Sequence, residues 1–287
     1  MQMKVMVTGA RGQLGQEVVR RLKLLGIPSL PVDVEDFDLT NPDQVNEAVL
    51  RLKPDAIIHC AAYTAVDRAE TEPARCCLIN ATGTHNLVRA ALKVDAKLCL
   101  ISTDYVFDGQ GEQPWETDAK RNPRSVYGQS KLQAEQAVST QMTRYFIVRI
   151  EWLFGIGGPN FVRTMLRLGR EREEVRVVND QIGSPTYAPD LAVFLCDLIR
   201  TDKYGIYHAS SEGECAWSDF AKEIFEQSGL RCRVIPVPSE EYPTLAKRPL
   251  NSRLSKACLD REGFARLPTW QDALSRYLDE LRAAGEL

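Results

Sequence analysis

A glycine-rich turn near the start of the chain is the feature that most limits what this sequence can fold into. Gly9, Gly12 and Gly15 follow the apolar run Val5–Thr8 and precede a stretch with apolar residues at helical spacing. Between a strand and a helix, such glycines let the backbone pass close to a pyrophosphate and aim helix N-terminal amides at its charge. The turn therefore predicts a dinucleotide-binding unit, although glycines in a merely tight turn are the alternative interpretation.

The composition excludes several classes of protein. The 287 residues carry a formal net charge of -3, and nucleic-acid binding usually demands a basic face. The longest apolar runs, such as Leu98–Ile101, are far shorter than the roughly 20 residues of a transmembrane helix. Because no signal peptide is visible before the first apolar run, we expect a cytoplasmic protein without membrane or nucleic-acid partners. The eight cysteines and three histidines show no zinc spacing, so no metal site is expected.

Strands and helices alternate over the first half of the chain. Apolar runs predict strands over residues 4–8, 30–34, 56–60, 97–102 and 145–149, and helical spacing predicts helices over 14–25, 42–52, 74–93 and 127–139. Strict alternation with short links is typical of parallel strands joined by right-handed crossovers. We therefore predict an α/β fold built on a doubly wound, Rossmann-like parallel sheet.

Beyond residue 150 the alternation is looser. Helices are predicted over 161–172, 189–200, 217–228 and 270–284, and strands over 175–178, 206–209 and 233–236. A chain of this length exceeds the usual size of one core. We predict a dinucleotide-binding domain over residues 1–150, which also receives elements from about 175–210. Residues 151–287 are expected to form mainly a smaller C-terminal α/β lobe that binds the substrate.

Two residues bear on which dinucleotide is bound. Asp33 ends the second predicted strand, 18 residues after Gly15 (33 minus 15). This is close to the roughly 20 at which an acid accepts a hydrogen bond from the adenosine 2′-hydroxyl of NADH. Arg11 lies inside the glycine turn and could instead neutralise the 2′-phosphate of NADPH, because a guanidinium suits phosphate. Both cofactors therefore stay open.

Tyr127 and Lys131 form the most specific chemical pattern. Four residues apart on a predicted helix, they share one face, so the ammonium can lie near the phenol. A nearby cation, together with the positive nicotinamide ring of the oxidised cofactor, moves the phenol pKa from about 10 towards neutral pH. Thr103 ends a predicted strand at the carboxyl edge of the sheet, where ligands bind in such folds. Beside a dinucleotide, these groups predict hydride transfer to a carbonyl, whereas the spacing alone also fits a surface Tyr–Lys pair.

The motifs resemble those of the extended short-chain dehydrogenase/reductases, and within them the dTDP-4-dehydrorhamnose reductases. The glycine and Tyr-x-x-x-Lys motifs belong to the whole superfamily, whereas Ser102–Phe107 and Asn179–Thr186 are typical of this branch. Cys60–Asp67, Ile79–Ala81 and Arg248–Ser252 extend the resemblance over nearly the whole chain. The resemblance implies an oxidoreductase that reduces the 4-keto group of dTDP-4-dehydro-L-rhamnose with NADPH or NADH. The product, dTDP-L-rhamnose, would serve polysaccharide biosynthesis.

The resemblance also implies the role of each site residue. Tyr127 would deliver the proton, Lys131 would hold the cofactor ribose and lower the tyrosine pKa, and Thr103 would hydrogen-bond the sugar oxygen. The residues implied to bind the dinucleotide are Gly9, Arg11, Gly12, Gln13, Leu14, Gly15, Asp33, Asp38, Leu39, Ala61, Ala62, Tyr63, Tyr127 and Lys131. Those implied to face the nucleotide-sugar substrate are Thr103, Asp104, Trp152, Arg248, Asn251 and Ser252. A homodimer is compatible with the resemblance.

Glu151 departs from the pattern of this branch. It stands before Trp152, where a small residue is expected, and a carboxylate there would repel a diphosphate sugar unless it faces elsewhere. This departure keeps open a non-catalytic, NADP-binding partner similar to the regulatory beta subunit of methionine adenosyltransferase. The intact Arg248–Ser252 segment favours an enzyme.

Related enzymes offer two further alternatives. Nucleotide-sugar dehydratases carry an acid where this chain has Tyr105, which lacks the carboxylate needed to remove water. Epimerases of the same superfamily are harder to exclude, although the Ser102–Phe107 block favours simple reduction.

Overall fold

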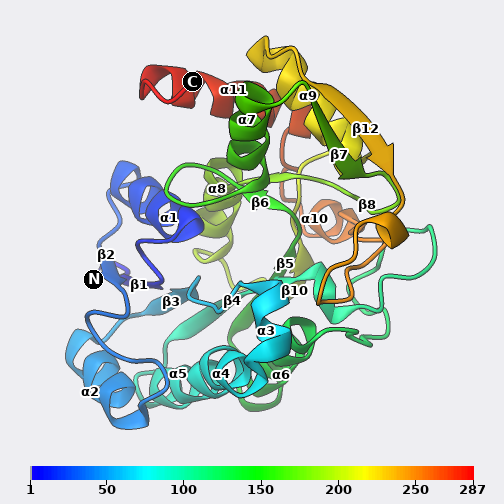
Figure 1. The fold of residues 1–287 in the computed structure, drawn as a ribbon. Helices are drawn as coiled ribbons and strands as arrows, with labels where there is room; N and C mark the ends of the chain where they lie inside the picture. Colours follow the sequence, from blue (N-terminus) through cyan, green and yellow to red (C-terminus); the bar gives the residue numbers. More distant parts are fainter. Residues whose placement is uncertain (1) are drawn as a thin grey trace.

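A six-stranded parallel sheet forms the centre of the computed structural model, which describes residues 2–287 (Figure 1). The strands run in the order β10-β5-β4-β3-β1-β2, and every neighbouring pair is parallel. They are β1 (Val5–Thr8), β2 (Ser29–Val32), β3 (Ala56–His59), β4 (Lys97–Thr103), β5 (Tyr145–Ile150) and β10 (Gly205–His208). The chain order reverses between β1 and β3, which is where ligands bind in open α/β sheets. The predicted doubly wound parallel sheet is confirmed.

Helices cover both faces of this sheet (Figure 1). Val5 and Val7 point into the core under one pair of helices, and Met6 points into the core on the opposite face. Because both faces are buried, the strands are continuous apolar runs rather than alternating ones. One face carries α1 (Gln13–Leu24) and α8 (Ala188–Leu198), and the other carries α2 (Pro42–Leu52), α5 (Gly83–Lys93) and α6 (Val126–Gln141).

The helix predicted over residues 74–93 is divided by a wide turn. It consists of α4 (Pro73–Cys77), the π-helical turn η1 (Leu78–Thr82) and α5, and the unpredicted α3 (Val66–Thr71) comes before it. The π turn carries the buried Asn80, whose amide accepts a hydrogen bond from Tyr63 N (2.7 Å) and donates one to Ser130 Oγ in α6 (2.9 Å). Apolar spacing along the sequence does not reveal the wider turn, because the segment stays amphipathic on both sides of it.

The second half of the chain builds a separate small core. Its parallel pair is β7 (Glu174–Val178) with β12 (Arg233–Val237), and it is surrounded by α7 (Phe161–Glu171), α9 (Trp217–Ser228) and α11 (Trp270–Ala283). Within the segment 175–210, β10 joins the large sheet beside β5 and α8 covers one of its faces. β7 pairs with β12 instead, because Val175 and Val177 pack into the core of the second lobe.

Short elements connect the two lobes. The two-residue strands are β6 (Leu153–Phe154) paired with β9 (Thr186–Tyr187), and β8 (Ile182–Gly183) paired with β11 (Cys215–Ala216). The remaining short helices are η2 (Asp104–Val106), η3 (Ser239–Glu241) and α10 (Ala257–Arg261). Across residues 2–287, no helix combines the length and apolar character needed to cross a membrane.

Candidate active site

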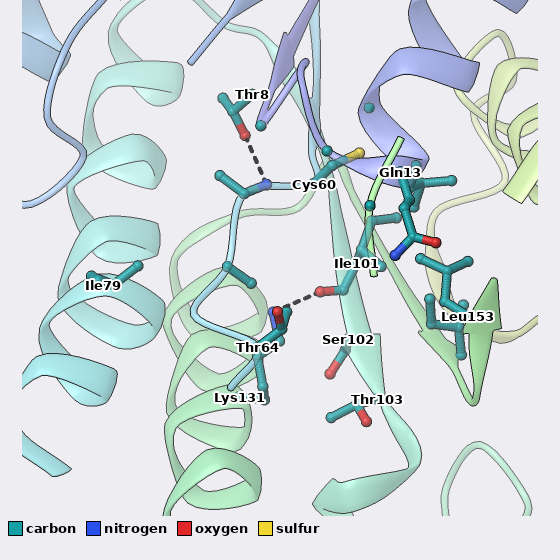
Figure 2. A pocket seen from close by; sticks show the side chains of 18 of the residues that line it. Thr8, Gln13, Cys60, Thr64, Ile79, Ile101, Ser102, Thr103, Lys131 and Leu153 are labelled. Atoms are coloured by element: carbon teal, nitrogen blue, oxygen red, sulfur yellow. Dashed lines mark hydrogen bonds between the residues drawn. The ribbon is translucent and has the colours of Figure 1, made fainter. Parts of the chain in front are cut away.

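A cavity of about 780 Å³ lies at the carboxyl ends of β1, β3, β4 and β5 (Figure 2). The segments that follow these strands line it, as expected for a doubly wound sheet. The predicted site residues in its lining are Gly9, Arg11, Gly12, Gln13, Leu14, Gly15, Asp33, Asp38, Leu39, Ala61, Ala62, Thr103, Asp104, Tyr127, Lys131 and Trp152. The structure therefore brings the glycine turn and the Tyr–Lys pair, about a hundred residues apart, to one site.

The glycine turn leaves room for an anion at the start of α1. Gly9 adopts a φ of +64°, and a Cβ there would stand 2.7 Å from Ala61 N. A Cβ on Gly15 would overlap the carbonyl oxygen of Gly9. Gly12 caps α1 without a side-chain hydrogen bond, and the first turn holds no acid. The helix N-terminal amides are therefore available to a phosphate, which fits the pyrophosphate of a dinucleotide.

An acidic residue, Asp33, and a basic residue, Arg11, lie together near the end of β2. The Asp33 carboxylate accepts hydrogen bonds from Arg11 N (2.8 Å) and Val34 N (2.9 Å). The Arg11 guanidinium pairs with Glu35 (2.7 Å), and both side chains are largely exposed. This part of the cavity offers an acceptor to a 2′-hydroxyl and a guanidinium to a 2′-phosphate.

Tyr127 lies in the first turn of α6. Ser125 caps this helix by accepting a hydrogen bond from Gly128 N (3.1 Å). A Cβ on Gly128 would overlap the carbonyl oxygen of Tyr105, so the glycine lets α6 approach the turn after β4 closely. The Tyr127 ring then meets the Tyr105 ring edge-on, with centroids 5.5 Å apart.

The protein environment of Tyr127 raises its pKa. Burial is the largest cause and the charge of Asp104 raises the pKa further, while the hydrogen bond with Thr103 lowers it. The lowering expected from Lys131 together with a bound, oxidised nicotinamide stays a prediction. Tyr127 holds its proton at neutral pH.

Lys131 is buried and reaches from α6 to β4 (Figure 2). Its ammonium donates a hydrogen bond to the Ile101 carbonyl oxygen (2.7 Å). Burial lowers its pKa to about 8, and the charge of Glu135, one helical turn away, opposes that shift. Glu135 is itself held by Arg149 through two 2.8 Å hydrogen bonds and by Ser102 Oγ (2.7 Å). A buried network thus joins the lysine helix to the ends of β4 and β5.

Thr103 and Asp104 follow at the carboxyl end of β4. Thr103 Oγ1 donates a hydrogen bond to Asp104 Oδ1 (3.0 Å), and Ser252 Oγ donates one to Asp104 Oδ2 (2.5 Å). Burial raises the pKa of Asp104 to about 6, although both hydrogen bonds favour its ionised form. Ser252 does not line the cavity and contacts it through Asp104.

Glu151 lines the cavity, and hydrogen bonds from the protein hold its carboxyl group. Its side chain is 1% exposed and accepts hydrogen bonds from Ser184 N (2.8 Å) and Ser210 Oγ (3.0 Å). Burial, followed by the charge of Asp104, raises its pKa well above the usual value. Both carboxyl oxygens are engaged by donors of the protein.

Three other predicted residues lie outside the cavity lining. Tyr63 directs its hydroxyl to Glu72 (3.1 Å). Arg248 pairs with Asp67 (2.6 Å). The Asn251 amide donates a hydrogen bond to the Gln113 carbonyl oxygen (2.9 Å). Each side chain is held by other protein groups, and their expected roles in binding ligands stay predictions.

Several lining residues were not predicted. They are Thr8, Val32, Val34, Phe37, Thr40, Cys60, Thr64, Val66, Ile79, Ile101, Ser102, Tyr105, Ile150, Glu151, Leu153, Gly157, Gly158, Pro159 and Trp217. Those next to strand ends could have been found from their position alone. Trp217 belongs to the second lobe, and no local pattern places it here. Within residues 2–287, no three potential His, Cys, Asp or Glu ligands gather around a common metal position.

Comparison with known proteins decides the family. A family model described as the RmlD substrate binding domain matches residues 3–283. The dTDP-4-dehydrorhamnose reductase of Escherichia coli (strain K12) is 41% identical over 296 residues, covering 97% of this chain and 98% of that protein. The chain belongs to the dTDP-4-dehydrorhamnose reductase family.

Other similar proteins agree with this family over the full length. The spore coat polysaccharide biosynthesis protein SpsK of Bacillus subtilis (strain 168) is 39% identical, covering 98% of this chain and 99% of its own. A crystal structure of dTDP-4-dehydrorhamnose reductase from Bacillus anthracis, in complex with NADP, has a TM-score of 0.95 and 45% identity. It covers 98% of this chain and 100% of its own. The reductase family is thus matched in both sequence and fold.

Proposed function

We propose that this chain is the oxidoreductase that reduces the 4-keto group of dTDP-4-dehydro-L-rhamnose to dTDP-L-rhamnose, with NADPH or NADH as cofactor. The observation that carries the proposal is that Tyr127, Lys131 and Thr103 line the same cavity as the glycine turn. Family membership supports the nucleotide-sugar substrate and a role in polysaccharide biosynthesis. The crystal structure of the Bacillus anthracis relative with NADP supports the cofactor class.

The residues around the start of α1 fit a dinucleotide. The free amides after Gly12 would hold the pyrophosphate, and Asp33 with Arg11 would meet the adenosine end. Lys131 has one ammonium hydrogen engaged by the Ile101 carbonyl, so two remain for the cofactor ribose. When bound, the dinucleotide supplies the hydride.

The side chains of this protein supply the proton and position the carbonyl. Tyr127 keeps its proton at neutral pH and transfers it to the alkoxide that develops on the sugar. The Thr103 hydroxyl would have to turn its one hydrogen from Asp104 Oδ1 to the same oxygen, and a hydrogen bond there is worth ~3 to 4 kcal/mol in well-studied sites. The charge of Lys131 stabilises the phenolate that remains after the transfer.

The substrate end of the cavity is proposed from the resemblance and from the contacts around Asp104. Asp104 and Trp152 line it, and Ser252 orients Asp104 through its hydroxyl. Arg248 is proposed to meet the diphosphate, and it would have to leave its ion pair with Asp67 to do so. Asn251 and Tyr63 are proposed as further ligands of the substrate and the cofactor.

Loss of NADPH or NADH absorbance on addition of the 4-keto nucleotide sugar tests the function. We expect turnover and a product identified by NMR as dTDP-L-rhamnose. The matched control is dTDP-glucose, which carries no keto group and should give no oxidation. No turnover with retained dinucleotide binding would contradict the proposal and favour a non-catalytic, NADP-binding regulatory subunit. Recovery of an epimer without net cofactor oxidation would favour an epimerase.

The setting of the enzyme is also a proposal. We propose a cytoplasmic protein without membrane or nucleic-acid partners, because the composition gives no basis for binding either. A homodimer, which is compatible with the resemblance, is proposed as its assembly. Light scattering during size-exclusion chromatography tests the assembly. A mass near 32.2 kDa, that of one chain, would exclude the dimer.

A further inference from the structure

The carboxyl group of Glu151 has no part in the mechanism described above, yet it joins several segments of the chain. It follows β5, and its two side-chain oxygens accept hydrogen bonds from Ser184 N and Ser210 Oγ. Its own carbonyl oxygen accepts a third from Thr186 Oγ1 (2.5 Å). Residues from the ends of β5, β8 and β10 are therefore connected at one buried side chain in the cavity wall.

The next residue adopts an unusual backbone conformation. Trp152 has a φ of +48°, in a backbone region that residues other than glycine rarely adopt. Such a conformation persists only where the surroundings enforce it. A Cβ on Gly183 would overlap Glu151 Oε2 and stand 2.9 Å from the Trp152 ring. The carboxyl group and the indole therefore pack together against the bare backbone of Gly183.

This conformation brings the Trp152 ring onto a second tryptophan. The rings of Trp152 and Trp217 stack with centroids 3.7 Å apart and planes inclined by 17°. Both residues line the cavity, Trp152 from the end of β5 and Trp217 from the first turn of α9. The Trp152–Trp217 stack therefore forms a flat apolar wall of the cavity that Thr103 and Asp104 also line, and flat aromatic faces suit the C–H face of a sugar ring.

We propose that Glu151 is a positioning residue for the substrate. Its hydrogen bonds fix the left-handed turn at Trp152 and hold the Trp152–Trp217 stack as the wall that receives the hexose ring. Glu151 acts through Trp152 and does not need to touch the reacting atoms. The inference rests on the proposed function, since it assigns the wall to the nucleotide sugar.

Two variants test the role of the carboxyl group. Glu151→Ala removes both acceptors, whereas Glu151→Gln can accept from Ser184 N and donate to Ser210 Oγ. Stacked tryptophans give an exciton couplet in circular dichroism. Subtracting the spectrum of the Trp217→Phe variant from that of the wild type isolates the couplet of the Trp152–Trp217 pair. We expect Glu151→Ala to lose most of the couplet and to raise the KM for the 4-keto nucleotide sugar roughly 10-fold or more, as misplaced binding groups do. Glu151→Gln should restore the couplet and the wild-type KM. Dinucleotide affinity should stay unchanged in both variants.

A matched control separates positioning from general destabilisation. Asp190→Ala removes another largely buried carboxylate, which pairs with Arg276 on α11 away from the cavity. It should lower Tm and leave the couplet and the KM unchanged. If Glu151→Ala does not fold, Ser210→Ala still removes one anchor and should weaken the couplet and raise the KM partially. A folded Ser210→Ala or Glu151→Ala protein with wild-type couplet and KM overturns the proposal.

The two readouts keep this inference apart from the function on which it rests. The couplet is measured on the protein without substrate, so it tests the link from Glu151 to the stack even if the wild-type chain does not reduce the sugar. A wild-type chain without turnover would overturn the proposed function and the assignment of the wall to the sugar.

Discussion

Tyr127 combines a half-buried position with a raised pKa, which suits a group that must give up a proton only to an alkoxide. Tyr127→Phe removes that proton and should lower turnover by roughly 100-fold or more, the range for a lost general acid. Dinucleotide affinity should change little. Tyr204→Phe, which removes a hydroxyl that donates to Asp202, is the matched control and should keep full activity. An active Tyr127→Phe protein would mean that another group donates the proton.

Lys131 gives the activity a dependence on pH. Its pKa is lowered to about 8. The positive charge of the ammonium is therefore present below that pH and is lost as the pH rises through it. The dinucleotide kcat/KM, which reports groups of the free enzyme, should therefore fall above about pH 8. Lys131→Met should be weakly active without this alkaline limb. Persistence of the limb in Lys131→Met would assign it to a different group.

Local motifs explain why many site residues could be predicted one by one. The glycines and the Tyr–Lys pair are recognised from spacing within a few positions, and the structure brings them to one cavity. Glu151 could not be understood in this way, because its hydrogen-bond partners Ser184 and Ser210 come from distant segments of the chain. Trp217 could not be placed either, since its contact with Trp152 joins residues 65 positions apart in the sequence (217 minus 152).

At the scale of elements, the strand–turn–helix unit around α1 offers a test with a built-in control. Gly9 and Gly26 have nearly equal φ values of +64° and +68°, so alanine at either position should cost about 1 to 2 kcal/mol of backbone strain. Only at Gly9 would the new Cβ also meet another segment, Ala61. Gly9→Ala should therefore weaken dinucleotide binding, measured by calorimetry, while Gly26→Ala lowers stability alone. Equal dinucleotide affinities would contradict the close approach.

The buried pair between β5 and α6 makes a second prediction at this scale. Arg149 and Glu135 are both fully buried. Arg149→Met leaves the carboxylate with only Ser102 and the longer ion pair to Arg121 (3.4 Å), so it should reduce the free energy of unfolding by about 3 kcal/mol, the lower end for a broken buried pair. Arg167→Ala breaks the exposed pair with Glu171 and should change the free energy of unfolding little. Urea denaturation measures both variants. Similar effects of the two would show that the buried network contributes nothing special.

Helices with clear ends were predicted best. The bounds of α2 and α9 match the sequence prediction, because Asn41 caps the first and Gly229, with a φ of +73°, ends the second. The two-residue strands β6, β8, β9 and β11 were missed, since two residues cannot show a period. The first half of the fold was therefore more predictable than the second.

On the scale of the whole molecule, the large sheet depends on both halves of the chain. β10 extends the sheet beyond β5, and α8 packs against α1, although both follow residue 150. Cys258 and Leu259 of α10 also enter the core beneath these helices. Residues 1–150 alone therefore lack an edge strand and part of the cover of one face.

A fragment of residues 1–150 should fail to fold cooperatively for this reason. We expect a broad thermal transition, binding of the dye ANS to exposed apolar surface and no measurable dinucleotide affinity. The full chain, treated identically, is the control. A sharp transition with dinucleotide binding by the fragment would show that the first domain is self-sufficient.

The π turn at Leu78–Thr82 divides one long helical stretch into two parts, and the side chains of one part are rotated about the helix axis relative to those of the other. Since each residue of an α-helix advances the direction of a side chain by about 100°, removal of one residue here would swing Cys76 and its neighbours away from Ser130. α5 would meanwhile remain seated on the sheet. The segment before the turn can therefore pack against α6 while the segment after it follows the sheet.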